Sequence, residues 1–570
     1  MPDTFDLIIR GGTVVDGTGQ APFEADVGVT QGVIAEVGQI RASGREEIDA
    51  RGRLVIPGFV DVHTHYDAQA TWASELTPST ANGVTTLLMG NCGVGFAPVR
   101  PHQRDMLISL MEGVEDIPEV VLSEGLTWEW DSFPDYLDYL GARHYDVDIA
   151  CQVPHAALRV YVMGERGARR EPATAEDCAA MAELTAQGLA AGAFGFSTSR
   201  LLQHRTAAGD PVPSYGAAEA ELVAIAEALR ETGHGWFQVV ADFGENQASE
   251  FELLERLAAR SGRPVTLTLL QRDSWPREWR ELLSRIENAN ALGHRITGQV
   301  RGRPTSTLLG FELTRNPFVR CPSWSDIAHL PPPERRAAVR DPALRARLIA
   351  EVEAYEAGTP AARERWMRIF PLGDPPDYEP ELADSIGARA EREGIAPAAL
   401  AYDVMSEQDA RGILYHPTTN YSGGDMAAVY EMLGHPNTLV GLGDGGAHVG
   451  IMCDATAMVH ALTHWTRDRE RGPRRPLEDM VRRLTSLNAH AMGLDDRGEV
   501  ACGMKADLNV IDYDALALRT PVIHYDLPAG GKRLQQASVG IDATVLSGAV
   551  VRRHGEATGA LPGRLLRAGR

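Results

Sequence analysis

The stretch VIPGFVDVHTHYDAQ, residues 55–69, decides the fold. An apolar run leads into His63 and His65, which one residue separates. Side chains alternate along a strand, so both imidazoles point to the same side. The pair is interpreted either as two ligands of one metal ion or as two histidines hydrogen-bonded to loop carbonyls. Asp61 and Asp67 are candidates to orient the imidazole rings.

Seven further apolar runs alternate with helical patterns, which predicts parallel βα units. With residues 58–63, these runs are 85–91, 147–153, 193–199, 236–242, 265–271, 295–300 and 438–444. Eight runs favour an α/β fold with a (β/α)8 TIM-like barrel, whose catalytic groups lie at the carboxyl ends of the strands. A polar stretch at about 312–410 is expected to form an insertion over the barrel mouth.

Both ends of the chain consist of short strand patterns broken by glycine turns. Residues 1–57 and 495–570 are therefore expected to form one small β-sandwich domain around a barrel at 58–494.

Charge and composition limit the partners. The chain of 570 residues has a formal net charge of -23, which argues against nucleic acid or an anionic membrane surface. Its six cysteines form no close pairs, so no disulfide framework is expected. The amino-terminal residues lack a signal-peptide pattern, and no apolar run reaches bilayer-spanning length. We expect a cytoplasmic protein with a small-molecule substrate and no membrane partner; a homo-oligomer remains open.

Two further strand ends carry candidate ligands. Asp444, in TLVGLGDGGAHVG, ends the last strand before two glycines and presents a carboxylate at the mouth, or else caps a helix. His448 either binds substrate or caps the same loop. Cys92, in LLMGNCGVGFAPV, ends the second strand. It is either a thiolate ligand suited to zinc or an inert buried cysteine.

Taken together, these motifs resemble the amidohydrolase superfamily and, within it, the D-aminoacylase (N-acyl-D-amino-acid deacylase) branch. The resemblance rests on LIIRGGTVVDGTG, RGRLVIPGFVDVHTHYD, GNCGVGFAPV and LTSLNAHAMGLDDRGEVACGMKADLNVIDYD, and it covers nearly the whole chain. It implies hydrolysis of an amide C–N bond in a metal-bearing barrel. By resemblance His63, His65 and Asp444 match a metal site, Cys92 matches a cysteine ligand, and Asp444 also matches the catalytic aspartate.

The chain departs from this family at the second metal position. Many two-metal members carry a carboxylated lysine after the fourth strand, but here that strand ends STSR and the only lysines are Lys505 and Lys532. The histidines that the branch carries after the fifth and sixth strands are also missing from FQVVADFGE and LTLLQRD. We therefore expect one divalent ion, zinc, held by His63, His65 and Asp444, with Cys92 available as a fourth ligand.

Other polar residues near the strand ends are expected to bind substrate. They are His155, Arg200, His204, Gln238, Asp242, Gln271, Arg303 and His448. An arginine at the mouth suits a substrate carboxylate, although surface ion pairs explain any single arginine equally well. The predicted function is a metal-dependent amidohydrolase acting on an N-acyl-D-amino acid or a similar small amide with a carboxylate. The alternative is a non-hydrolytic enzyme or an inactive binding protein on the same scaffold.

Overall fold

The computed structural model describes residues 4–569, and all eight predicted strand runs form barrel strands. The strands are β6 (Phe59–Asp61), β7 (Val84–Met89), β8 (Asp148–Cys151) with β9 (Val153–Pro154), β10 (Gly195–Arg200), β11 (Trp236–Ala241), β12 (Val265–Thr268), β13 (Ile296–Val300) and β17 (Thr438–Val440). They pair in parallel in chain order, as β6–β7–β8 and β9–β10–β11–β12–β13–β17. The α/β barrel is thus confirmed.

A side chain joins the first and last barrel strands. Asn488, on α20 (Ser486–Ala491), donates to the carbonyls of Val60 at 2.8 Å and Val440 at 2.6 Å. One amide thereby satisfies a backbone acceptor on each side of the seam. Just beyond, the backbone N–H of Asp444 donates to the carbonyl of His63 at 3.0 Å. This seam brings two candidate site residues together although they are far apart in sequence.

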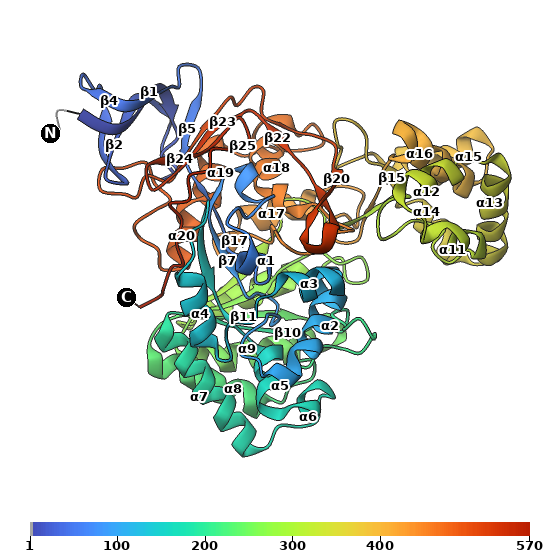
Figure 1. Ribbon diagram of the computed structural model, residues 1–570, viewed down its shortest axis with the longest axis horizontal. Coiled ribbons are helices and arrows are strands. Elements are labelled where there is room, and N and C mark those ends of the chain that lie inside the picture. Colours follow the sequence, from blue (N-terminus) through green and yellow to red (C-terminus); the bar gives the residue numbers. More distant parts are fainter. Residues whose placement is uncertain (1–3, 570) are drawn as a thin grey trace.

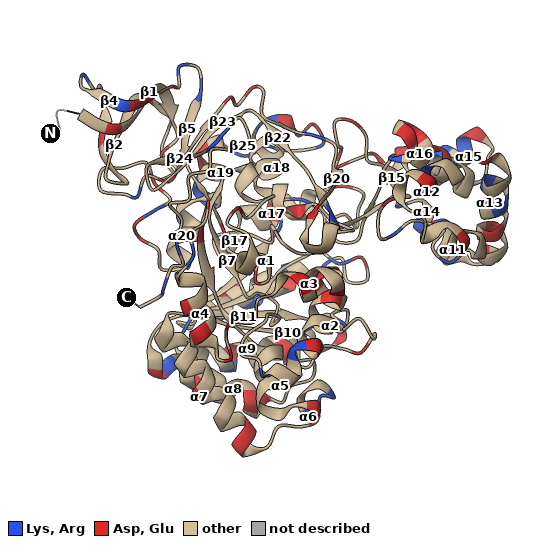
Figure 2. Ribbon diagram, viewed as in Figure 1, with Lys and Arg blue, Asp and Glu red and all other residues tan. Residues whose placement is uncertain are grey.

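Amphipathic helices cover the outside of the barrel, among them α7 (Ala175–Ala191), α8 (Glu219–Thr232), α9 (Gln247–Ser261) and α10 (Glu278–Ala291). Acidic and basic residues lie along these outer helices, and the strands between them carry few (Figure 2). An apolar layer that includes Leu88, Ala150, Phe194 and Trp236 closes the inside of the barrel below the site. Among residues 4–569, no helix is both long and apolar enough to cross a bilayer.

Strands from both ends of the chain form one nine-stranded sheet beside the barrel (Figure 1). Its strands are β1 (Thr4–Val14), β2 (Phe23–Thr30), β3 (Val33–Gly38), β4 (Ser43–Asp49), β5 (Leu54–Pro57), β18 (Leu508–Ile511), β23 (Ile541–Leu546), β24 (Ala549–Arg553) and β25 (Glu556–Ala557). The two halves join where β18 pairs with β5. A single residue, Gly58, separates β5 from β6. The sheet therefore anchors the strand that leads to the two histidines.

Not all of the carboxyl-terminal segment lies in this sheet. The hairpin of β20 (Val522–Leu527) and β21 (Gly531–Gln535) reaches the barrel instead. There Leu534 donates its N–H to the carbonyl of Val449 at 2.7 Å, and Arg533 donates to the carbonyl of Thr77 at 2.7 Å. The hairpin therefore borders the loop that follows Asp444.

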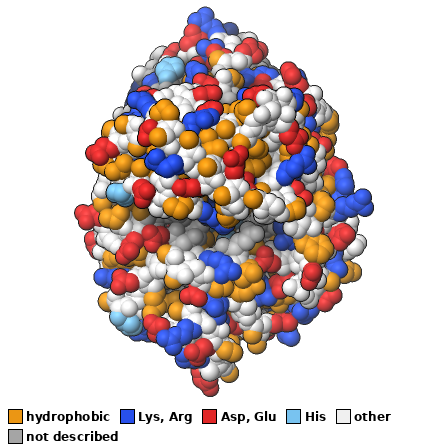
Figure 3. All heavy atoms as spheres, turned by 90° about the vertical axis from the view of Figure 1, so that its right-hand side faces the viewer, with side chains coloured by type: hydrophobic (Ala, Val, Ile, Leu, Met, Phe, Trp, Pro, Cys, Tyr) orange, Lys and Arg blue, Asp and Glu red, His pale blue; other side chains and the backbone are white. Residues whose placement is uncertain are grey.

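The insertion forms a helical lobe with a hydrophobic core of its own. Its helices are α11 (Pro322–Ala328), α12 (Pro332–Ala338), α13 (Pro342–Glu356), α14 (Pro360–Trp366), α15 (Ile386–Glu393) and α16 (Pro397–Ala410). The base of the lobe reaches the barrel rim, where Arg368 pairs with Asp273 at 2.8 Å. Its helices project away from the barrel at the right of Figure 1, whereas we expected the insertion to lie over the mouth. The face that carries the lobe is hollowed across its middle (Figure 3).

Candidate metal centre

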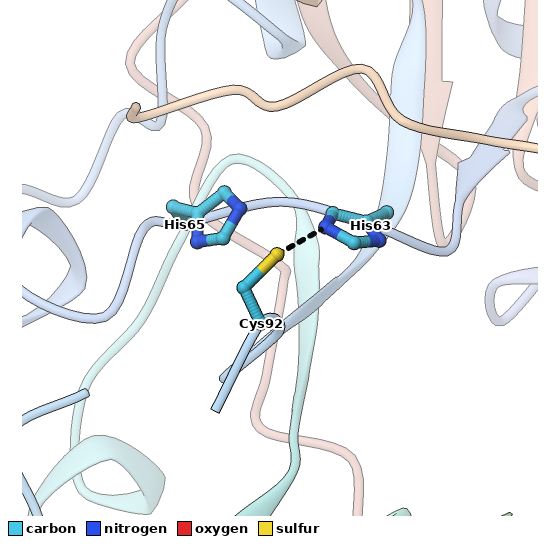
Figure 4. Close-up of side chains that lie close together, drawn as sticks. All are labelled: His63, His65 and Cys92. Carbon is cyan, nitrogen blue, oxygen red and sulfur yellow. Dashed lines mark hydrogen bonds between the residues drawn. The ribbon is translucent and has the colours of Figure 1, made fainter. Parts of the chain in front are cut away.

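Four candidate ligands converge at the carboxyl ends of the barrel strands. His63 and His65 follow β6, Cys92 follows β7, and Asp444 follows β17. Ligand atoms of the two histidines and the cysteine all lie within 4.8 Å of one another, and all three residues are buried. Sγ of Cys92 lies between the two imidazole rings, 3.3 Å from Nε2 of His63 (Figure 4).

Neighbouring side chains fix how each imidazole presents itself. Nδ1 of His63 lies 2.6 Å from Oε1 of Gln299, and Nδ1 of His65 lies 3.2 Å from Oε1 of Glu115. At His63 this oxygen acceptor keeps the proton on Nδ1 and leaves Nε2 free as a ligand. Nδ1 of His65 is buried and forms no hydrogen bond. Burial lowers the pKa of both histidines, which favours the neutral form that a metal requires.

Asp444 presents one carboxylate oxygen to both histidines. Its Oδ1 lies 3.7 Å from Nε2 of His63 and 3.9 Å from Nε2 of His65, and this buried oxygen has no hydrogen-bond partner. Its other oxygen, Oδ2, accepts a hydrogen bond from Arg301. Burial alone raises the pKa of Asp444, but Arg301 and the histidines outweigh burial and hold that pKa well below its usual value. The carboxylate is therefore held as an anion facing the imidazoles.

At the site, the backbone adopts left-handed conformations that residues other than glycine rarely adopt. Cys92, Asp444 and His448 have φ of 55°, 44° and 53°. Such left-handed residues cost free energy and cluster at functional sites. Gly446 explains part of the sequence motif, because a Cβ there would lie 2.6 Å from the carbonyl oxygen of His65. The double glycine after Asp444 allows this loop to approach the histidine strand closely.

The donor set fits a single zinc ion. Zinc accepts imidazole nitrogen, thiolate and carboxylate ligands in a tetrahedral arrangement, and all three types meet here. The unpartnered Oδ1 of Asp444, close to two unprotonated nitrogens, is the arrangement that a cation stabilises. Burial and the nearby carboxylates of Glu115 and Asp444 raise the pKa of Cys92, so its thiolate form requires a cation beside it.

Comparison with known proteins agrees with this geometry. Residues 46–552 match the profile described as the amidohydrolase family. The chain belongs to the amidohydrolase family. It is 27% identical to a D-aminoacylase of Alcaligenes xylosoxydans xylosoxydans over 99% of this chain and 97% of that protein. A crystal structure of D-aminoacylase matches with a TM-score of 0.65 at 27% identity, covering 99% of this chain and 100% of the other. An N-acyl-D-glutamate deacylase from Bordetella bronchiseptica, solved with zinc and a phosphonate inhibitor, matches with a TM-score of 0.66 at 24% identity, covering 99% and 100%.

In this amidohydrolase, three of the residues expected to bind substrate lie at the candidate metal centre. Oε1 of Gln238 accepts the backbone N–H of Cys92 at 3.0 Å. Nδ1 of His204 lies 2.9 Å from Oγ of Ser199. Burial lowers the pKa of His204 to about 3, and His448 and the candidate ligand His63 contribute to this lowering. Nε2 of His448 lies 3.7 Å from Oε2 of Glu115.

Three others form hydrogen bonds and ion pairs elsewhere in the barrel. Both ring nitrogens of His155 are engaged, by Thr198 at 2.8 Å and Glu221 at 2.7 Å. Arg200 forms a two-pronged pair with Glu250 at 2.6 and 2.8 Å. Arg303 is buried against Asp454 at 2.9 Å. Substrate binding by these three remains a prediction that no contact with the metal centre supports.

The last two, Asp242 and Gln271, lie in rim loops. Asp242 accepts the N–H of Leu202 at 2.6 Å, and Gln271 accepts the N–H of Ser422 at 3.2 Å. Within residues 4–569, neither side chain forms a hydrogen bond with a candidate ligand. Each instead accepts a hydrogen bond from the backbone of a loop. Their role in substrate binding also stays a prediction.

The partners of the ligands were only partly visible in the sequence. Asp61 accepts the backbone N–H of His63 at 3.1 Å, and Asp67 accepts that of Gly90 at 3.1 Å, so neither orients an imidazole ring. Burial raises the pKa of each of these carboxyls to about 7. Gln299 instead contacts the ring of His63, Glu115 lies beside the ring of His65, and Arg301 binds Asp444. Arg301 stands in the QVRGRP motif that drew attention to Arg303, but Glu115 ends α2 (Arg104–Glu115), far from any strand-end motif.

Proposed function

We propose that this amidohydrolase is a zinc-dependent hydrolase that cleaves the amide C–N bond of small carboxylate-bearing amides, with N-acyl-D-amino acids as the first substrates to test. The observation that carries the proposal is the meeting of His63, His65, Cys92 and Asp444 at the barrel mouth, with Oδ1 of Asp444 directed at both imidazoles. The similarity to D-aminoacylase over 99% of the chain supports the substrate class.

When bound, zinc polarises a carbonyl oxygen and lowers the pKa of water towards neutrality. The side chains of the protein supply the remaining steps. Asp444 accepts a proton from the attacking water and returns it to the leaving nitrogen, so that one carboxylate serves as base and then as acid. Arg301 keeps Asp444 ionised and fixes the direction of Oδ1. His204 and His448, partly buried near the carboxylate and with lowered pKa values that favour the neutral rings, are placed to hydrogen-bond the substrate.

The proposed stoichiometry is one metal ion per chain. The ligands of the proposed site are His63, His65, Cys92 and Asp444. No lysine lies after β10, and the position that the resemblance leads us to expect for a histidine on β11 is occupied by Gln238. An amide oxygen already engaged by a backbone N–H is a poor substitute for an imidazole.

A substrate screen combined with metal analysis tests the proposal. The zinc-loaded enzyme is assayed for release of free amine from N-acetyl-D- and N-acetyl-L-amino acids and from cyclic amides, with Asp444→Asn as the inactive control. Turnover by the wild type only, together with about one zinc per chain, is the expected result. A metal-free protein that binds ligands without turnover would instead establish the non-hydrolytic alternative.

A further inference from the structure

We propose that the side-chain amides of Gln238 and Gln299 form an oxygen-binding pocket inside the barrel, beside Cys92 and His63. The pocket presents N–H donors, so its ligand is an anionic or carbonyl oxygen of the substrate. This inference rests on the proposed hydrolysis and names the group that receives the negative charge of the reacting substrate.

The orientation of each amide is determined by the donor that it faces. The backbone N–H of Cys92 is always a donor, so the atom of Gln238 that lies 3.0 Å from it must be the oxygen. Nδ1 of His63 carries the proton when Nε2 binds metal, so the atom of Gln299 at 2.6 Å is also the oxygen. Neither amide is free to flip. The NH2 group of each amide is thereby left as a hydrogen-bond donor.

These two NH2 groups are buried and have no partner. Gln238 and Gln299 are both 0% exposed, and Nε2 of each lacks any hydrogen bond. Leaving a buried donor unpaired costs about 1–3 kcal/mol. Two such donors anchored to two neighbouring ligand residues indicate a built binding site, since Sγ of Cys92 and Nε2 of His63 are only 3.3 Å apart.

The strand between the two amides adds to the same surface. β12 lies between β11 and β13, with Thr266 opposite Gln238 and Thr268 opposite Gln299. Residues opposite each other in paired strands project from the same face. The hydroxyl oxygens of Thr266 and Thr268 are likewise buried without a partner. Three adjacent strands therefore direct unpaired polar atoms into one region of the barrel interior.

The chemistry of this region excludes a second cation and suits an oxyanion. Amide NH2 groups carry partial positive charge and repel metal ions, whereas donors aimed at developing negative charge stabilise the tetrahedral intermediate of acyl transfer. On β11, the amide of Gln238 then binds oxygen near the place where the resemblance leads us to expect an imidazole.

Two substitutions separate this role from a purely structural one. Gln238→Glu and Gln299→Glu each keep the oxygen that accepts from Cys92 or His63 and replace only the NH2 donor. The probe is the methylphosphonate mimic of the tetrahedral intermediate of N-acetyl-D-alanine hydrolysis, titrated calorimetrically into zinc-loaded protein. Zinc affinity is measured separately by chelator competition. Gln187→Glu, on the outer face of α7, controls for added charge.

Each glutamate variant is expected to bind the phosphonate at least about 10–100-fold more weakly, the range for losing one hydrogen bond to a charged group. Zinc affinity should not fall in either glutamate variant, because a carboxylate behind His63 strengthens that imidazole as a ligand. For Gln187→Glu, the affinities for phosphonate and for zinc should both stay within about 3-fold of the wild type. Phosphonate affinity unchanged in both variants, or no phosphonate binding by the zinc-loaded wild type, overturns the pocket. Failure of the proposed function looks different, because the wild type then hydrolyses none of the amides in the substrate screen.

Discussion

Arg301 donates a hydrogen bond to Oδ2 of Asp444, the carboxylate oxygen opposite the one that faces the histidines. The same guanidinium pairs with Asp454, which is also held by Arg303. The proposed catalytic carboxylate is thus the end of a buried chain of alternating charges. Because Arg301 binds the anionic form of Asp444, it keeps that carboxylate ionised and fixes its orientation. A metal ligand and a general base both require this.

Arg301→Lys tests this chain of charges. A lysine ammonium is a point charge and does not reproduce a planar fork that contacts two carboxylates at once. Loss of one charge-assisted hydrogen bond, about 1.5–3 kcal/mol, predicts a fall in kcat/KM of about 10–100-fold. Steady-state kinetics at saturating zinc measure it, with circular dichroism to confirm folding. A folded variant with wild-type kcat/KM would show that Asp444 needs no fixed partner.

Asp444→Asn tests the base. The amide keeps the shape of the side chain but accepts no proton and is a weaker ligand. Removal of a general base costs about 10²–10⁴ in rate, so kcat should fall within that range at full zinc loading. Turnover within a few-fold of the wild type would assign the proton transfer to another group.

Cys92→Ala tests the sulfur ligand. Zinc affinity and kcat/KM should both fall, because a buried thiolate is among the stronger zinc donors. Cys151→Ala is the matched control, since Cys151 is also buried, on β8, and lies outside the cluster of His63, His65 and Cys92. That control should retain its zinc. Equal zinc content in the two variants would make Cys92 a structural cysteine.

The sequence predicted the barrel because strand runs and strand-end motifs are local patterns. An apolar run that ends in HxH or in Asp-Gly-Gly predicts a barrel strand with candidate ligands at its end, as at His63 and Asp444. About a dozen consecutive residues are enough for that prediction. No local sequence pattern predicts which helix end packs against a strand end. Glu115 lies beside His65 only because the tertiary fold brings them together. The choice between Arg301 and Arg303 was equally invisible, because both are buried within one motif.

His155 shows the converse case, a strand-end histidine whose neighbours satisfy it. Thr198 and Glu221 take both ring nitrogens, and Glu221 also pairs with Arg159. His155→Ala should therefore reduce the free energy of unfolding by about 1–3 kcal/mol through lost hydrogen bonds. Denaturant unfolding measures this change. A large rise in KM without loss of stability would restore His155 to the substrate site.

Substitution of Glu115 tests whether a neighbouring side chain strengthens metal binding by His65. Its Oε1 lies 3.2 Å from Nδ1 of His65, its Oε2 lies 3.7 Å from Nε2 of His448, and its side chain is 1% exposed. Burial and the carboxylates of Asp444 and Asp67 raise the pKa of Glu115 well above its usual value, so its ionised form requires a cation nearby. A carboxylate behind a metal-bound imidazole raises the basicity of that imidazole, and its loss typically weakens metal binding about 10–100-fold.

We expect Glu115→Leu, which keeps the volume but removes both oxygens, to weaken zinc binding by about 10–100-fold. Glu115→Gln retains an acceptor for His65 and should lose distinctly less. Chelator competition reports the two affinities directly, independent of turnover. Equal losses in both variants would mean that packing around Glu115, rather than its oxygen behind His65, supports the metal.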